Sequence, residues 1–101
     1  MSVLDDPNLD LESRLNGQTG RIGWHELERY YARGVVRQVA KGLDLIAVGK
    51  AIIDNDQTQV EAWINNEQLR VPEDDQALAW HERNAELWAL VIAPWVLVQE
   101  A

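Results

Sequence analysis

The stretch from Leu87 to Val98 constrains the fold of this chain more than any other feature. It contains twelve residues without a charge, a hydroxyl or an amide, in a chain whose net charge is −8. Such side chains gain free energy when they leave water, so the stretch must be buried in the protein's own core or against a partner. With Pro94 inside it, the stretch is too short for a membrane-spanning helix, which needs about 20 residues.

Two secondary structures are compatible with residues 87–98. Their valine, isoleucine and tryptophan content favours a strand, with Pro94 at a bend or an edge where no amide donor is needed. Helix as far as Ala93 is the alternative, because the stretch begins with good helix formers. As a strand it would be apolar on both faces, so it would either lie between two layers or complete its burial in a second chain.

The rest of the sequence predicts an α+β domain. Aspartate and proline indicate helix starts, glycine indicates helix ends, and short β-branched runs indicate strands. Asp6-Pro7 is typical of a helix start, and Asp44 and Asp56 are expected to cap two further helices. These signals predict helices over residues 7–16, 24–33, 44–53, 56–67 and 73–84, a glycine-rich loop over 17–23, and strands over 35–39, 69–72 and 87–98.

We therefore expect four or five helices with a two- or three-stranded antiparallel sheet, in an order like that of a winged helix. Trp24, Trp63 and Trp80 have the helical spacing of core residues, and Val60 and Ile64 are expected to share the buried face of Trp63. The length of 101 residues fits a single domain over 1–101, in which residues 1–6 are expected to fray.

Composition excludes several kinds of chemistry. The chain has no cysteine, which removes disulfides and thiolate chemistry and is typical of a reducing compartment. Its first residues do not resemble a secretory signal, so a cytoplasmic location without membrane attachment is expected. The only serines are Ser2 and Ser13, and no catalytic pattern is present. We expect neither enzymatic activity nor a cofactor.

The two histidines each stand in a Trp-His-Glu triplet, at His25 and His81. Neither triplet continues to the second histidine of a zinc-protease motif. A metal site that used both histidines with Glu26 or Glu82 would require the two helices to meet, and nothing in the sequence requires that. No metal site is therefore predicted.

Basic residues are concentrated between Arg21 and Lys41, where five bases accompany two acids. Solvated arginines that pair with nearby glutamates explain this region most simply, and an anionic surface is the alternative contact. The residues that would provide the contact are Arg29, Arg33, Arg37 and Lys41. Nucleic acid is disfavoured as a partner, since the helix that would read DNA in a winged-helix order, residues 56–67, has three acids and no base.

The leading hypothesis is a non-enzymatic interaction or regulatory module that forms a homodimer through its apolar C-terminal segment, with a protein partner as a further option. A nucleic-acid-binding protein that uses the Arg21–Lys41 region is the alternative. The candidate interface residues are Trp88, Leu90, Ile92, Trp95 and Leu97.

Several motifs together resemble a known family. They are Leu15-Asn-x-x-Thr-x-x-Ile-x-Trp-x-Glu-Leu27, Leu43-Asp-Leu45, Asp56 with Val60 and Trp63, and Pro94-Trp-Val-Leu-Val-Gln99. In these residues the chain resembles the small bacterial family catalogued as domain of unknown function 2288. The resemblance implies a stand-alone bacterial cytoplasmic protein. It implies no activity, and no functional residues are carried over from it.

Overall fold

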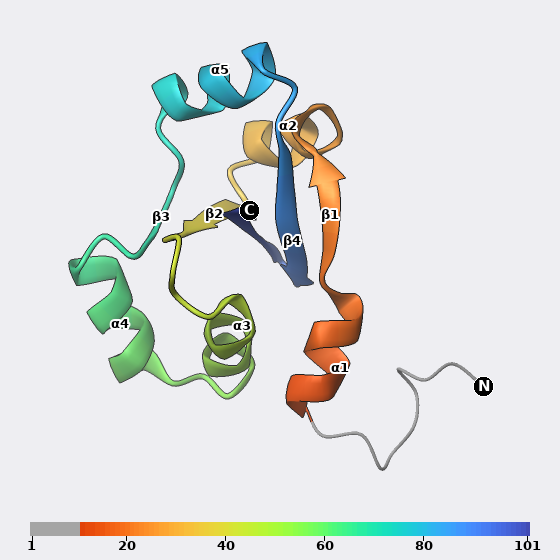
Figure 1. Cartoon of the computed structure of the whole chain (residues 1–101). Coiled ribbons are helices and arrows are strands. Elements are labelled where there is room, and N and C mark those ends of the chain that lie inside the picture. Colours follow the sequence, from red (N-terminus) through yellow and green to blue (C-terminus); the bar gives the residue numbers. More distant parts are fainter. Residues whose placement is uncertain (1–10) are drawn as a thin grey trace.

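The computed structural model describes residues 11–101 as five helices around one five-stranded sheet (Figure 1). The N-cap predicted at Asp6-Pro7 and the fraying predicted for residues 1–6 lie outside the described residues. The helices are α1 (Leu11–Gln18), α2 (Trp24–Ala32), α3 (Leu45–Ile53), α4 (Gln57–Asn65) and α5 (Asp74–Glu82). The strands are β1 (Gly20–Gly23), β2 (Val36–Val39), β3 (Leu69–Arg70), β4 (Glu86–Ile92) and β5 (Trp95–Glu100).

The sheet is mixed, with the strand order β1-β4-β5-β2-β3. Strand β5 runs parallel to β2, with Val36 opposite Val96, and the other neighbours are antiparallel. The α+β class is confirmed. The smaller antiparallel sheet and the winged-helix order are wrong, because β1 adds an edge strand, β2 pairs in parallel, and the C-terminal strands occupy the middle of the sheet instead of a peripheral wing.

The apolar C-terminal stretch forms the β4–β5 hairpin, so the strand interpretation is confirmed for most of residues 87–98. The chain turns at Ala93 and Pro94, and the two strands pair from Ile92 opposite Trp95 to Leu87 opposite Glu100. One apolar run thus supplies two neighbouring central strands. Central strands have a neighbour on both edges and are the part of a sheet that packed helices cover most completely, so a wholly apolar stretch is suited to this position.

Helices cover both faces of this hairpin (Figure 1). Alternate side chains of a strand point to opposite faces, and the core divides accordingly. Leu90, Ile92 and Leu97 pack with residues of α1, α3 and α4 in one cluster. Leu87 and Val98 pack with residues of α2 and α5 in the other. The two-sided apolar pattern is therefore satisfied within one chain.

The helices that carry the candidate site begin where the sequence predicts. The Asp44 carboxylate accepts hydrogen bonds from the backbone N–H groups of Ile46 and Ala47, and Asp56 accepts one from Gln59. These bonds satisfy amides that have no partner inside a helix. The caps fix the starts of α3 and α4 and therefore the direction in which α4 leaves the core.

The glycine-rich segment 17–23 was expected to be a loop and instead contains the edge strand β1. Glycine lowers strand propensity, but pairing with an available neighbour decides the outcome. Arg21 lies opposite Trp88 and Ile22 opposite Leu87 of β4. Ile22 also packs against the core cluster of α2 and α5. This single apolar contact holds the strand against the core, although the glycine-rich composition of the segment does not indicate a strand.

Candidate binding groove

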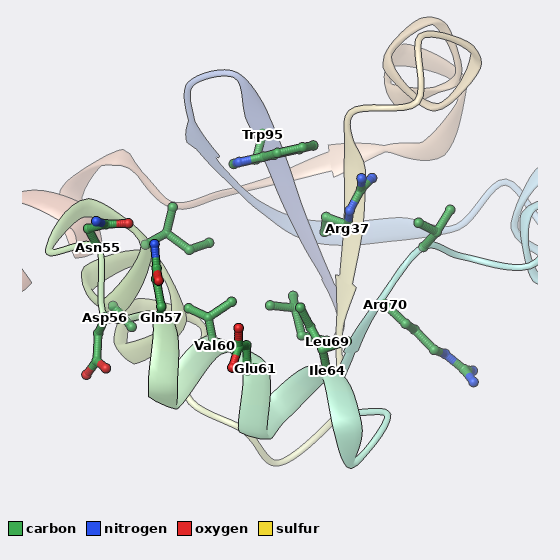
Figure 2. Close-up of a pocket in the computed structure, with 13 residues that line it drawn as sticks. Arg37, Asn55, Asp56, Gln57, Val60, Glu61, Ile64, Leu69, Arg70 and Trp95 are labelled. Atoms are coloured by element: carbon green, nitrogen blue, oxygen red, sulfur yellow. The ribbon is translucent and has the colours of Figure 1, made fainter.

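A groove with a volume of about 370 Å³ opens between α4 and the end of the sheet formed by β5, β2 and β3 (Figure 2). A hollow of this size, with mainly apolar walls and a few polar groups, is the usual form of a binding site. The residues that line it are Arg37, Ala51, Ile52, Asn55, Asp56, Gln57, Val60, Glu61, Ile64, Leu69, Arg70, Val71 and Trp95.

Trp95 and Arg37 form one wall of the groove. The guanidinium carbon of Arg37 lies 4.5 Å from the centroid of the Trp95 ring, within the range of a cation–π contact. Arg37 also donates hydrogen bonds to the carbonyl oxygens of Gly34 and Val36, at 3.0 and 2.9 Å. Figure 2 shows the indole and the guanidinium side by side at the top of the groove. These contacts hold a positive charge and a flat apolar ring in a fixed arrangement.

Helix α4 and the residue after β3 provide the opposite rim. Ile64 and Val71 are 51% and 52% exposed, although both are large apolar side chains. The expectation that Ile64 would share the buried face of Trp63 is wrong. Trp63 enters the core and Val60 is half-buried, whereas Ile64 faces the groove because α4 is covered only along a narrow stripe.

The charges around the groove are arranged by element. The acids Asp56 and Glu61 belong to the α4 side, and the bases Arg37 and Arg70 belong to β2 and β3. The lining therefore carries equal numbers of acidic and basic side chains, in a chain whose net charge is −8. This region is electrostatically neutral while the whole molecule is strongly acidic.

The five residues predicted to form an interface do not share one surface. Leu90, Ile92 and Leu97 are 0%, 7% and 0% exposed and belong to the core. Trp88 is 38% exposed beside β1, where the guanidinium carbon of Arg21 lies 5.3 Å from its ring centroid. Trp95 is half-buried and lines the groove. Helices on both faces of β4 and β5 explain why three of the five are inaccessible.

The basic residues predicted to contact an anion are also dispersed. Arg29 and Arg33 lie over the ring of Tyr30, with guanidinium carbons 4.9 and 5.8 Å from its centroid. Arg37 lies on β2 in the groove wall, and Lys41 lines a separate hollow near the C-terminus. The four-residue spacing does not produce one stripe, because the helix ends before Gly34 and the chain continues as a strand.

Arg37 and Trp95 were predicted from the sequence as contact residues, whereas the apolar members of the groove, chiefly Ile52, Ile64 and Val71, were not. One signal was available in α4. This helix has three large apolar residues, Val60, Trp63 and Ile64, among otherwise mostly polar ones. Together they form an apolar face that is wider than the part of the helix buried in the core.

The chain is similar to a solved structure and to a family model. It is similar to the NMR solution structure of PA1075 from Pseudomonas aeruginosa, with 38% sequence identity and a TM-score of 0.78, over 99% of this chain and 93% of that one. No curated protein matches it. The family model described as "Protein of unknown function (DUF2288)" matches residues 10–100. Because that match spans nearly the whole sequence, the chain belongs to the DUF2288 family.

Proposed function

We propose that this protein is a small, non-enzymatic interaction module that forms a homodimer through the groove face, which we define as Arg37, Asp56, Glu61, Ile64, Arg70, Val71 and Trp95. The exposure of Ile64 and Val71 beside an apolar hollow is the observation that carries the proposal. Apolar surface that is contiguous and rimmed by polar groups is typical of an interaction site. Of the C-terminal segment, Trp95 is the residue that takes part.

A second copy of the chain is the occupant that the charges favour. Two molecules of net charge −8 repel each other at most of their surface, but the groove lining is neutral. A two-fold axis would place the acidic α4 side of one copy over the basic β2 and β3 side of the other. The projecting Ile64 and Val71 would enter the partner's hollow, as a self-complementary two-fold contact requires.

The location that we propose is the bacterial cytoplasm. The similarity to a Pseudomonas aeruginosa protein and the absence of cysteine support this part of the proposal. No helix within residues 11–101 has both the length and the apolar character needed to cross a bilayer.

Sedimentation velocity over a range of protein concentrations tests the homodimer. We expect the wild-type chain to sediment increasingly as a dimer at micromolar concentrations. Ile64→Glu should shift the population to monomer, because it places a charge in the apolar contact. Leu78→Glu is the matched control, since Leu78 is 56% exposed on α5, which packs on the other face of the sheet. A monomeric wild type, or equal dissociation in both variants, would refute the proposal.

Binding of nucleic acid through residues 21–41 is a second, separate candidate. The specific observation in its favour is the exposed arrangement of Arg29 and Arg33 around the Tyr30 ring. Cationic and aromatic groups in such proximity occur in single-strand binding sites. Fluorescence anisotropy with labelled single-stranded RNA and DNA at low salt tests it. Binding that falls with salt and is lost in Arg33→Glu would support this candidate, and absence of binding would remove it.

A further inference from the structure

The two Trp-His-Glu triplets meet in the structure. The rings of Trp24 and Trp80 lie 4.9 Å apart in the core, and the rings of His25 and His81 lie 4.8 Å apart outside it. The imidazole planes differ by 19°, so the two rings are stacked. Packing of the tryptophans therefore brings α2 and α5 together. This is the contact that a metal site with both histidines needs, and the sequence alone did not predict it.

We propose that His25, Glu28 and His81 form a binding site for a divalent transition-metal ion, with Zn²⁺ as the representative ion. One potential ligand atom from each of the three side chains lies within 4.8 Å of the others. The carboxylate is that of Glu28, not of Glu26 or Glu82, because Glu28 follows His25 by three positions and so shares its face of α2.

The donor set fits a borderline-soft cation. Two imidazoles and one carboxylate are common ligands of Zn²⁺, whereas Mg²⁺ and Ca²⁺ prefer oxygen ligands alone. Zn–N bonds of about 2.0–2.1 Å place tetrahedral ligand atoms about 3.4 Å apart. Ligand atoms within 4.8 Å need only small side-chain rotations to reach that spacing. His25 and His81 are exposed, which leaves room for water at a further coordination position.

The present contacts show which bond the ion would replace. Nδ1 of His81 lies 2.5 Å from Oε1 of Glu28, within hydrogen-bond distance. Nε2 of His25 lies 3.5 Å from the carbonyl oxygen of His81, which is at most a weak hydrogen bond. A cation bound between this imidazole nitrogen and the carboxylate would replace their hydrogen bond, and the proton of that bond would pass to solvent. The site would then connect α2 to α5.

Isothermal titration calorimetry of the full chain with ZnCl₂ tests the site. We expect one Zn²⁺ per chain at neutral pH and no comparable heat with MgCl₂. Loss of an outer-shell partner already lowers metal affinity by about 10–100-fold. Loss of a ligand in His25→Asn, Glu28→Gln or His81→Asn should therefore weaken binding by at least about tenfold.

Glu82→Gln is the matched control, because Glu82 adjoins His81 on α5 but is outside the three-residue cluster. Its affinity for Zn²⁺ should equal that of the wild type. Thermal unfolding gives a second readout: Zn²⁺ should raise the melting temperature of the wild type and of Glu82→Gln, and leave that of folded His81→Asn unchanged. Absence of Zn²⁺ binding to the wild type, or equal affinity in the histidine variants, would overturn the proposal.

Discussion

The indole Nε1 of Trp80 donates a hydrogen bond to Oε1 of Glu100 across 2.9 Å, which joins α5 to the last strand. Trp80 is fully buried, and the same carboxylate oxygen lies 3.3 Å from a guanidinium nitrogen of Arg83. A buried donor without a partner costs about 1–3 kcal/mol. Glu100→Ala should therefore lower the free energy of unfolding, measured by urea denaturation, by about 1–3 kcal/mol. The control Glu82→Ala, at an exposed position, should change it by less than about 0.5 kcal/mol. Equal effects would show that the hydrogen bond contributes nothing.

The phenol of Tyr31 links α2 to the start of α5 and makes stability depend on pH in alkali. It donates a hydrogen bond of 2.6 Å to Oδ1 of Asp74, with the carbonyl oxygen of Pro72 at 3.1 Å. The hydrogen bond to Asp74, reinforced by burial and by the negative charge of that carboxylate, raises the pKa of Tyr31 from 10.0 to about 12.

The sign of this linkage follows from the raised pKa. The unfolded chain loses the phenolic proton at a lower pH than the folded chain does. The stabilisation is therefore complete below pH 10 and is lost as pH rises from 10 towards 12. Tyr31→Phe should be less stable than the wild type at neutral pH, and the difference should shrink across that window. A difference that stays constant in urea titrations from neutral pH to pH 12 would contradict this explanation.

Gly49 allows α3 to approach β4 closely. A Cβ atom at this position would lie 2.9 Å from Cδ2 of Leu90 and 3.3 Å from Cδ1 of Ile92, both of which are buried. Gly49→Val should lower the free energy of unfolding by about 1–3 kcal/mol through overpacking. Ala62→Val, at an exposed position of α4, places valine in a helix without crowding; its lower helix propensity than alanine should cost less than about 1 kcal/mol. Equal losses in thermal or urea unfolding would argue against a packing constraint at Gly49.

Local signals predicted those parts of the fold that short stretches of sequence determine. Asp44 and Asp56 cap the helices that they were expected to cap, and Trp24, Trp63 and Trp80 are buried. The sheet was underestimated for a physical reason. The edge strand β1 owes its conformation to pairing with β4, and the parallel pairing of β2 with β5 joins segments far apart in sequence. Such pairings leave no short-range pattern.

The candidate sites, too, could be predicted only where short stretches of sequence determine them, and not where they depend on contacts between distant elements. The apolar composition of residues 87–98 indicated burial but did not distinguish a second chain from a second layer of helices. The exposure of Ile64 depends on which face of α4 the core covers, and only Trp63 of that helix is buried. The His25–His81 pair depends on the contact between α2 and α5, whereas the spacing of His25 and Glu28 along one helix was already visible in the sequence.

The most direct test of homodimer formation through the groove face uses two charge variants, alone and mixed. Arg70→Glu gives this face an excess of acid, and Glu61→Arg gives it an excess of base. Two like faces repel, whereas an acidic face and a basic face attract. Sedimentation velocity should therefore show each variant as a monomer and their equimolar mixture as a heterodimer. A mixture that stays monomeric while the wild type dimerises, or single variants that dimerise as well as the wild type, would contradict the account.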